Sequence, residues 1–156
     1  MGTQWLVRRR VLRALGDRYD SVVTEPLTDE ELQFLQAALD LAREGATAHL
    51  TELVDAGLPV NLSSGSGDTL LILAAYHVHA DTVHALLARG ADTARVNDKG
   101  QTALGAAVFR QSAEVVTALL DAGADPRLGP RSAIDVAEVF DLPDMMALLT
   151  IDRPRG

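Results

Sequence analysis

The sequence of 156 residues predicts an all-α fold built from about four helix-turn-helix repeats in tandem. First, a shift of 33 residues aligns the chain with itself, a period typical of stacked helical units. Second, hydroxyl residues and glycines recur where helices of that period would begin and end. Third, aromatic residues make up only 4% of a chain rich in Ala and Leu, which favours closely packed helices over a β-sandwich.

The internal repeat is clearest over residues 67–129. The shift of 33 places Gly67 on Gly100, Thr69 on Thr102 and Leu71 on Leu104, and beyond the third copy the register changes to 30. The first copy is degenerate. The predicted domain therefore spans residues 28–152, with a preceding segment of residues 1–27, a tail of residues 153–156, and repeats at about 34–66, 67–99, 100–129 and 130–150.

Each unit carries signals for two helices and the turn that follows. A hydroxyl residue stands just before each apolar segment, where its oxygen can accept an N–H that is free at a helix start; these residues are Thr69, Thr102 and Ser132. The second helix shows apolar residues at i, i+3 and i+4, as in Val116, Leu119 and Leu120. Gly90 and Gly123 follow the second helices at positions that favour a positive φ.

These residues resemble the ankyrin-repeat consensus over about residues 34–150. The resemblance is carried by two strings of residues, Gly67-Asp-Thr69-Leu-Leu71-Ile-Leu-Ala74-Ala75 with Val83-His-Ala-Leu86-Leu87-Ala-Arg-Gly90-Ala91-Asp92, and Gly100-Gln-Thr102-Ala-Leu104 through Gly123-Ala124-Asp125-Pro126. It implies an ankyrin-repeat solenoid that binds other proteins. The chain departs from the consensus where the family has Pro (Leu70, Ala103, Ala133) and then His (Ile72, Gly105, Asp135).

The first forty residues differ in character from the repeats. Thr28 and Glu31 form a capping box that opens a helix through Leu35 and Leu39, which we interpret as the first repeat helix extended backwards. Residues 1–27 form a basic, helical N-terminal extension in this interpretation, with five Arg against two Asp in residues 1–20. Two roles stay open for it: a cap on the end of the stack, or a basic arm for a membrane surface or partner groove.

Composition narrows the classes of function. The net charge of −8 argues against nucleic-acid binding, which needs a basic face, and favours a basic or neutral protein partner. The absence of Cys excludes disulfides and thiolate chemistry. No apolar run is long enough to span a membrane, and the N-terminus carries charge where a signal peptide has its apolar core and lacks a small-residue cleavage site. We therefore expect a cytoplasmic protein for which a membrane partner is disfavoured. Arginine outnumbers lysine 13 to 1, which suggests a bacterial gene of high GC content.

The sequence offers no catalytic or metal-binding motif, so we expect neither enzyme activity nor a cofactor. His77, His79 and His84 lie close together in the sequence, but metal ligands on one face of a helix are spaced at i, i+3 or i, i+4. Gly65-Ser-Gly67 lacks the Lys and the following helix of a phosphate-binding loop. The predicted activity is binding, as an adaptor or inhibitor; the alternative is a structural role through self-association, although a monomer is expected.

The resemblance to ankyrin repeats implies which residues would contact a partner along the concave groove. The exposed ends of the first helices and the tips of the turns give Arg43, Glu44, Tyr76, His77, Phe109, Arg110, Val139 and Phe140, together with Ser66, Asp68, Asp98, Lys99, Gln101 and Arg131. Tyr76 and Phe109 are equivalent residues, and Phe140 lies one place further on in the last unit. We expect these three rings to form a partner-binding stripe; the alternative is that the two Phe rings fold back into the core.

Overall fold

The computed structural model describes residues 28–151, a range that contains eight α-helices and no strand. The helices form four consecutive pairs, which confirms the predicted all-α repeat fold. Their bounds are α2 Asp29–Glu44, α3 Thr47–Asp55, α4 Leu70–Tyr76, α5 Ala80–Ala88, α6 Ala103–Phe109, α7 Ala113–Asp121, α8 Ala133–Val139 and α9 Pro143–Thr150. The predicted helical extension in residues 1–27 and the tail in residues 153–156 lie outside the described residues.

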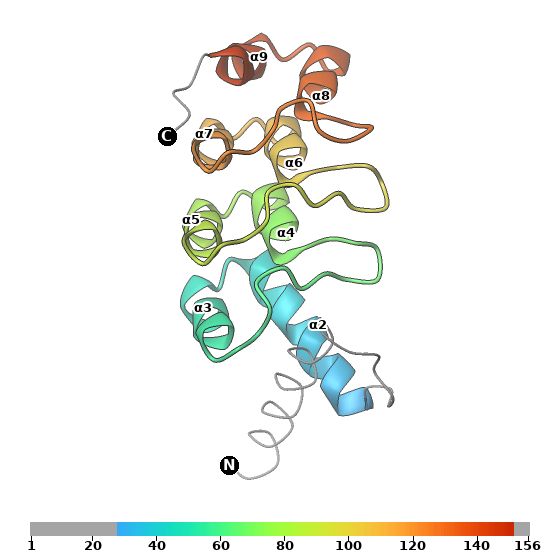
Figure 1. Ribbon diagram of the computed structural model, residues 1–156, viewed down its shortest axis with the longest axis vertical. Coiled ribbons are helices and arrows are strands. Elements are labelled where there is room, and N and C mark those ends of the chain that lie inside the picture. Colours follow the sequence, from blue (N-terminus) through green and yellow to red (C-terminus); the bar gives the residue numbers. More distant parts are fainter. Residues whose placement is uncertain (1–27, 152–156) are drawn as a thin grey trace.

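The helices stack in two parallel rows (Figure 1). The first helices of the pairs, α2, α4, α6 and α8, form one row, and the second helices form the other. Each helix packs on the equivalent helix of the next pair, and the long turns that connect the pairs all project to the same side. Equivalent residues of successive repeats therefore lie side by side along the stack.

The predicted helix starts are confirmed by hydrogen bonds from the backbone. The N–H of Ile72 donates to the hydroxyl of Thr69 at 3.1 Å, and Gly105 donates to Thr102 at 3.0 Å. Ser132 accepts in the same way from Asp135, at 3.2 Å. The three capping residues are all buried. Because α4, α6 and α8 each have only seven residues, one satisfied N–H is a large part of the hydrogen bonding of each helix.

The first repeat begins with a longer helix, as the capping box predicts. The hydroxyl of Thr28 accepts from the N–H of Glu31, and the Glu31 carboxylate accepts from the N–H of Thr28, both at 3.1 Å. The resulting α2 runs for 16 residues, more than twice the length of α4. Only its C-terminal part corresponds to the first helices of the later repeats, so the capping box extends this helix backwards beyond the repeat unit.

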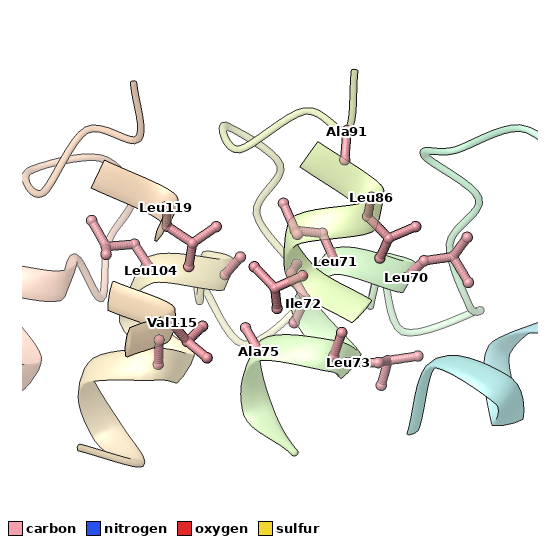
Figure 2. Packing of buried hydrophobic residues seen from close by; sticks show 14 of the residues in the cluster. Leu70, Leu71, Ile72, Leu73, Ala75, Leu86, Ala91, Leu104, Val115 and Leu119 are labelled. Carbon is pink, nitrogen blue, oxygen red and sulfur yellow. The ribbon is translucent and has the colours of Figure 1, made fainter. Parts of the chain in front are cut away.

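The core is a continuous layer of Leu, Val and Ala between the repeats (Figure 2). Leu71, Leu86, Leu104 and Leu119 are almost completely buried and come from alternate rows of the stack. The first helices carry small residues that have no more than 1% of their surface exposed: Ala74, Ala75, Ala106 and Ala107. Small side chains let the backbones of neighbouring helices approach closely, and their burial is what the sequence predicts.

The sharp turn inside each repeat uses a left-handed residue at one equivalent position. This residue is Gly45 in the first repeat, with φ 73°, then Val78, Gln111 and Asp141, with φ between 52° and 61°. A left-handed conformation is strained for a β-branched residue such as Val78. The sequence gives no hint of this position, because only the first repeat fills it with glycine.

The side chain of His79 makes Gly45 necessary for a second reason. Its Nε2 lies 2.7 Å from the carbonyl oxygen of Arg43, so this nitrogen donates the hydrogen bond and satisfies a carbonyl at the C-terminus of α2. A Cβ on Gly45 would lie 2.5 Å from the Nδ1 of the same ring. The second repeat is therefore attached to the first by a histidine that tolerates no side chain at residue 45.

Substituting Gly45 by Ala should destabilise the fold more than the same change at Gly90. Gly90 also has a positive φ, 84°, but no neighbouring atom lies within 4 Å of a Cβ built there. Gly90→Ala should cost about 1–2 kcal/mol for the left-handed conformation alone. Gly45→Ala should cost at least about 1 kcal/mol more because it also displaces His79. Urea unfolding measures both; equal losses would contradict the role given to His79.

Removing one helix cap should have a measurable effect because the capped helix is so short. We expect Thr69→Ala to lower the free energy of unfolding by about 1–2 kcal/mol, since it leaves the N–H of Ile72 without its acceptor. Thr69→Ser keeps the hydroxyl and is the matched control, with a loss of a few tenths of a kcal/mol. Urea unfolding distinguishes the two variants, and an equal effect of both would show that the methyl group of Thr69 matters more than its hydroxyl.

Candidate functional site

The three aromatic residues at the ends of the first helices form a row of rings in contact. Tyr76 ends α4, Phe109 ends α6, and Phe140 caps α8. The rings of Tyr76 and Phe109 are stacked, with centroids 6.3 Å apart and planes 9° apart. Phe109 and Phe140 meet edge to face, at 5.3 Å and 70°. We call these three residues the aromatic ladder.

The aromatic ladder lies outside the core. The exposed fractions are 36% for Tyr76, 39% for Phe109 and 54% for Phe140, and the neighbouring Val139 is 76% exposed. The alternative in which the two Phe rings fold back between the helices is therefore wrong. Contiguous exposed apolar side chains of this size are typical of interaction surfaces on proteins. Whether these residues contact a partner stays a prediction.

Arginine and histidine side chains surround the Tyr76 end of the ladder. The guanidinium carbon of Arg110 lies 5.5 Å from the centre of the Tyr76 ring, which is cation–π geometry. The ring of His77 packs edge to face against Tyr76 with centroids 5.2 Å apart. The rings of His77 and His79 follow at 6.3 Å, and Arg43, at the C-terminus of α2, pairs with Asp40 at 2.6 Å. We call Arg43, His77, His79 and Arg110 the basic corner.

The charged groups that act on His77 are basic although the repeat domain is acidic. Desolvation by neighbouring atoms lowers the pKa of His77 below its ordinary value, and electrostatic repulsion from the nearby His79, Arg110 and Arg43 lowers it further. Residues 28–151 contain 18 Asp and Glu against 7 Lys and Arg, a net charge of −11 with His neutral. The basic corner thus differs in sign from the average of the surface around it.

The titration of His77 provides a test of this arrangement. Its pKa in the folded protein should lie below 6.5, and Arg110→Gln should raise it because a neighbouring positive charge is removed. Imidazole resonances followed by NMR across pH measure both values. Arg127→Gln, in the loop between α7 and α8, is the control that should leave the pKa of His77 unchanged. An unchanged value in Arg110→Gln would show that Arg110 does not act on His77.

The same lowered pKa fixes the sign of a pH effect on stability. Between the lowered folded pKa and the ordinary value of 6.5, the unfolded chain binds more protons at residue 77 than the folded chain does. The free energy of unfolding therefore contains the full stabilising contribution of neutral His77 above pH 6.5. This contribution is lost as the pH falls from 6.5 towards the lowered value.

Some of the residues at the predicted turn positions form hydrogen bonds with a neighbouring turn, and others are exposed to solvent. Ser66 and Asp68 lie in the turn before α4, and Asp68 accepts hydrogen bonds from the Ser66 hydroxyl at 3.2 Å and from Asn97 Nδ2 at 2.8 Å. Gln101 is half-buried and also faces Asn97, with its Oε1 3.4 Å from Nδ2. Asp98 and Lys99 are exposed at the tip of the next turn. These contacts hold neighbouring turns together.

Asn97 is the residue that the sequence prediction missed in these turns. It is buried, and its Oδ1 accepts from the N–H groups of Lys99 at 3.0 Å and Gln101 at 2.9 Å. The N–H of Asp98 donates to the carbonyl of Ser66 at 3.0 Å, so the two turns are also joined by the backbone. An Asn in a turn is too common to single out in a sequence, because only the contact across repeats gives it this role.

The remaining predicted site residues are exposed at the two ends of the stack. Glu44 is exposed at the C-terminus of α2, and Arg131 is exposed just before α8. The N–H of Arg131 donates to the carbonyl of Gly100 at 3.2 Å. The turn before α8 is the one shortened by three residues in the sequence, and in the structure its Pro130 packs over Gly100. Binding by Glu44 and Arg131 stays a prediction.

Two other features are absent from the described part of the chain. Within residues 28–151, no three His, Cys, Asp or Glu side chains are arranged to hold a metal ion. His79, one of the histidines considered from the sequence, uses its Nε2 on the backbone of α2. No helix in the same range has the length and apolar character needed to cross a membrane.

The geometry defines a helical-repeat protein that displays equivalent residues in a row along one side of the stack. The family model described as ankyrin repeats, in three copies, matches residues 35–129, which is more than half of the chain. The chain belongs to the ankyrin-repeat family. Ankyrin repeats are generally protein–protein interaction modules, and their fold is known as a non-enzymatic scaffold for binding proteins.

Two known proteins show how far the similarity extends. An ankyrin repeat protein of Pseudomonas aeruginosa is 51% identical over 59 residues, which cover 37% of this chain and 34% of that relative. The chain thus matches about a third of the length of that bacterial protein. The crystal structure of the human ASB11 ankyrin repeat domain is 30% identical, with a TM-score of 0.65, and the match covers 72% of this chain and 52% of that one.

Proposed function

We propose that this protein binds another protein through the aromatic ladder and the basic corner, as an adaptor or inhibitor without catalytic activity of its own. The observation that carries the proposal is the row of exposed rings of Tyr76, Phe109 and Phe140, which come from three successive repeats and contact one another. The three rings are half of all the aromatic residues in the chain. Membership of the ankyrin-repeat family supports a binding role of this kind.

The ladder has the properties of an energetic centre for an interface. Aromatic side chains bury about 150–250 Å² each and dominate the binding energy of many interfaces. The ring contacts also hold the side chains in place before a partner arrives, which reduces the entropy lost on binding. Three rings alone fall short of the roughly 800 Å² that each partner buries in a stable complex. The exposed residues Asp98, Lys99 and Arg131 are the candidates for the rest of the contact.

Removing two rings together should abolish partner binding and keep the fold. In the variant Tyr76→Ala/Phe109→Ala, we expect the affinity for a captured partner to fall at least about thirtyfold, as for the loss of interface hot spots. The free energy of unfolding should fall by about 2–4 kcal/mol, because each ring is only partly buried and the stacked pair is lost. Pull-down followed by titration calorimetry measures binding, and circular dichroism with urea unfolding measures the fold.

The matched control is Leu32→Ala, which removes an apolar side chain that is 51% exposed at the start of α2, away from the ladder. This variant should bind like the wild type. Undiminished binding by a folded Tyr76→Ala/Phe109→Ala variant would overturn the proposal. Extensive unfolding of that variant would show that the rings serve stability.

The exposed ladder also supports a second candidate, in which another copy of the chain covers the rings. Light scattering over a range of concentrations distinguishes the two, because a strict monomer excludes self-association. The monomeric state, the cytoplasmic location and the absence of nucleic-acid and membrane binding stay predictions. The same holds for the role of the basic residues in positions 1–20, which lie outside the described residues.

A further inference from the structure

The basic side chains of the basic corner differ in how far they are already engaged by other residues. Arg43 pairs with Asp40, and His79 is held by the carbonyl of Arg43. Arg110 lies over Tyr76, and among residues 28–151 it has no carboxylate within ion-pair distance. His77, between Tyr76 and His79, is exposed. Arg110 and His77 therefore remain available to an anionic group placed beside the ring of Tyr76.

The apolar and the cationic parts of this surface are in direct contact. The Tyr76 ring contacts both Arg110 and the Phe109 ring, and Phe109 contacts Phe140 in turn. Consider an extended peptide whose side chain covers the rings. A side chain one or two residues further along that peptide can therefore reach Arg110. At the other end of the ladder, Phe140 is followed by the exposed Asp141. The charge along the ladder thus runs from positive at Tyr76 to negative at Asp141.

The negative charge of the whole domain does not remove this local preference. At physiological ionic strength, charges more than about 8 Å apart are largely screened, whereas a carboxylate next to Arg110 interacts at contact distance. A partner with many acidic residues would be repelled by the net charge of −11 over residues 28–151. A single carboxylate within an otherwise neutral or basic segment satisfies both conditions.

We propose that the partner contacts the ladder with a segment in which an Asp or Glu lies within two residues of an aromatic or large aliphatic side chain. The apolar side chain covers Phe109 and Phe140, and the carboxylate accepts hydrogen bonds from Arg110 and His77 at the Tyr76 end. This inference rests on the proposed binding function of the ladder.

A random 16-residue peptide library displayed on phage tests the proposal even though the partner is unidentified. Phage that bind the immobilised wild-type chain are then passed over the immobilised Tyr76→Ala/Phe109→Ala variant, and those that bind this variant are discarded. The remaining peptides depend on the ladder. We expect the enriched sequences to share an Asp or Glu within two residues of an aromatic or large aliphatic residue. A synthetic peptide of that sequence should lose about fivefold to tenfold in affinity when its carboxylate is replaced by the amide.

The variant Arg110→Gln should bind the acidic peptide and its amide analogue with equal affinity, because the cation that distinguishes them is gone. Arg127→Gln removes an exposed arginine from the loop between α7 and α8 and should keep the preference of the wild type. Fluorescence anisotropy with labelled peptides measures all combinations. The comparison isolates the contact between Arg110 and the peptide carboxylate.

Three other results of these experiments would contradict the proposed acidic segment. Ladder-dependent peptides that are neutral or basic would overturn the acidic segment and leave the proposed binding function standing. A library that yields no ladder-dependent peptide would overturn both. A wild-type dimer that Tyr76→Ala/Phe109→Ala dissociates would show that a second copy of the chain is the occupant, and would overturn the proposal in that way.

Discussion

Burial between the repeats is the constraint on which the rest of this structure depends. No helix pair can cover its own apolar face, and α4, α6 and α8, with seven residues each, are far shorter than the roughly 12–15 residues that an isolated helix needs for marginal stability. They persist because Ala and Leu side chains on both sides of each helix are buried by its neighbours. Stability is therefore shared along the stack, as expected for a solenoid.

The same constraint creates the candidate binding surface. Since each first helix packs on the next and carries buried small residues such as Ala75 and Ala107, equivalent positions at the helix ends come close enough for side chains to touch. Aromatic residues at this position in two repeats, and one place further on in the last, then produce a row of rings at contact distance. Residues that recur along the sequence thus lie next to one another on one continuous surface. A substitution in one repeat alters this surface at one place.

The connections between repeats are less uniform than the core. The first and second repeats are joined by His79 and the glycine that it requires, while the later repeats place a strained Val78, a Gln or an Asp in the same left-handed turn. Neighbouring turns are joined by Asn97, although the chain lacks the Pro and His of the ankyrin consensus at the helix starts. Different side chains therefore occupy the left-handed turn and connect neighbouring repeats at different places in the stack.

The sequence by itself determined the helical repeat, the hydroxyl caps at Thr69, Thr102 and Ser132, and the longer first helix. These features depend on residues close together in the chain, whose spacing already fixes the local hydrogen bonds and the buried face. The positions of the aromatic residues were also readable, because they follow the repeat.

Only the tertiary structure decided that the rings of Phe109 and Phe140 lie outside the core, and that Arg110 and His77 gather beside Tyr76 in an acidic domain. It alone revealed the roles of His79 and Asn97, whose partners lie 36 and 29 residues away in the chain. Such contacts depend on the distance between stacked repeats and on side-chain direction. Neither quantity is encoded in the spacing of residues along one repeat.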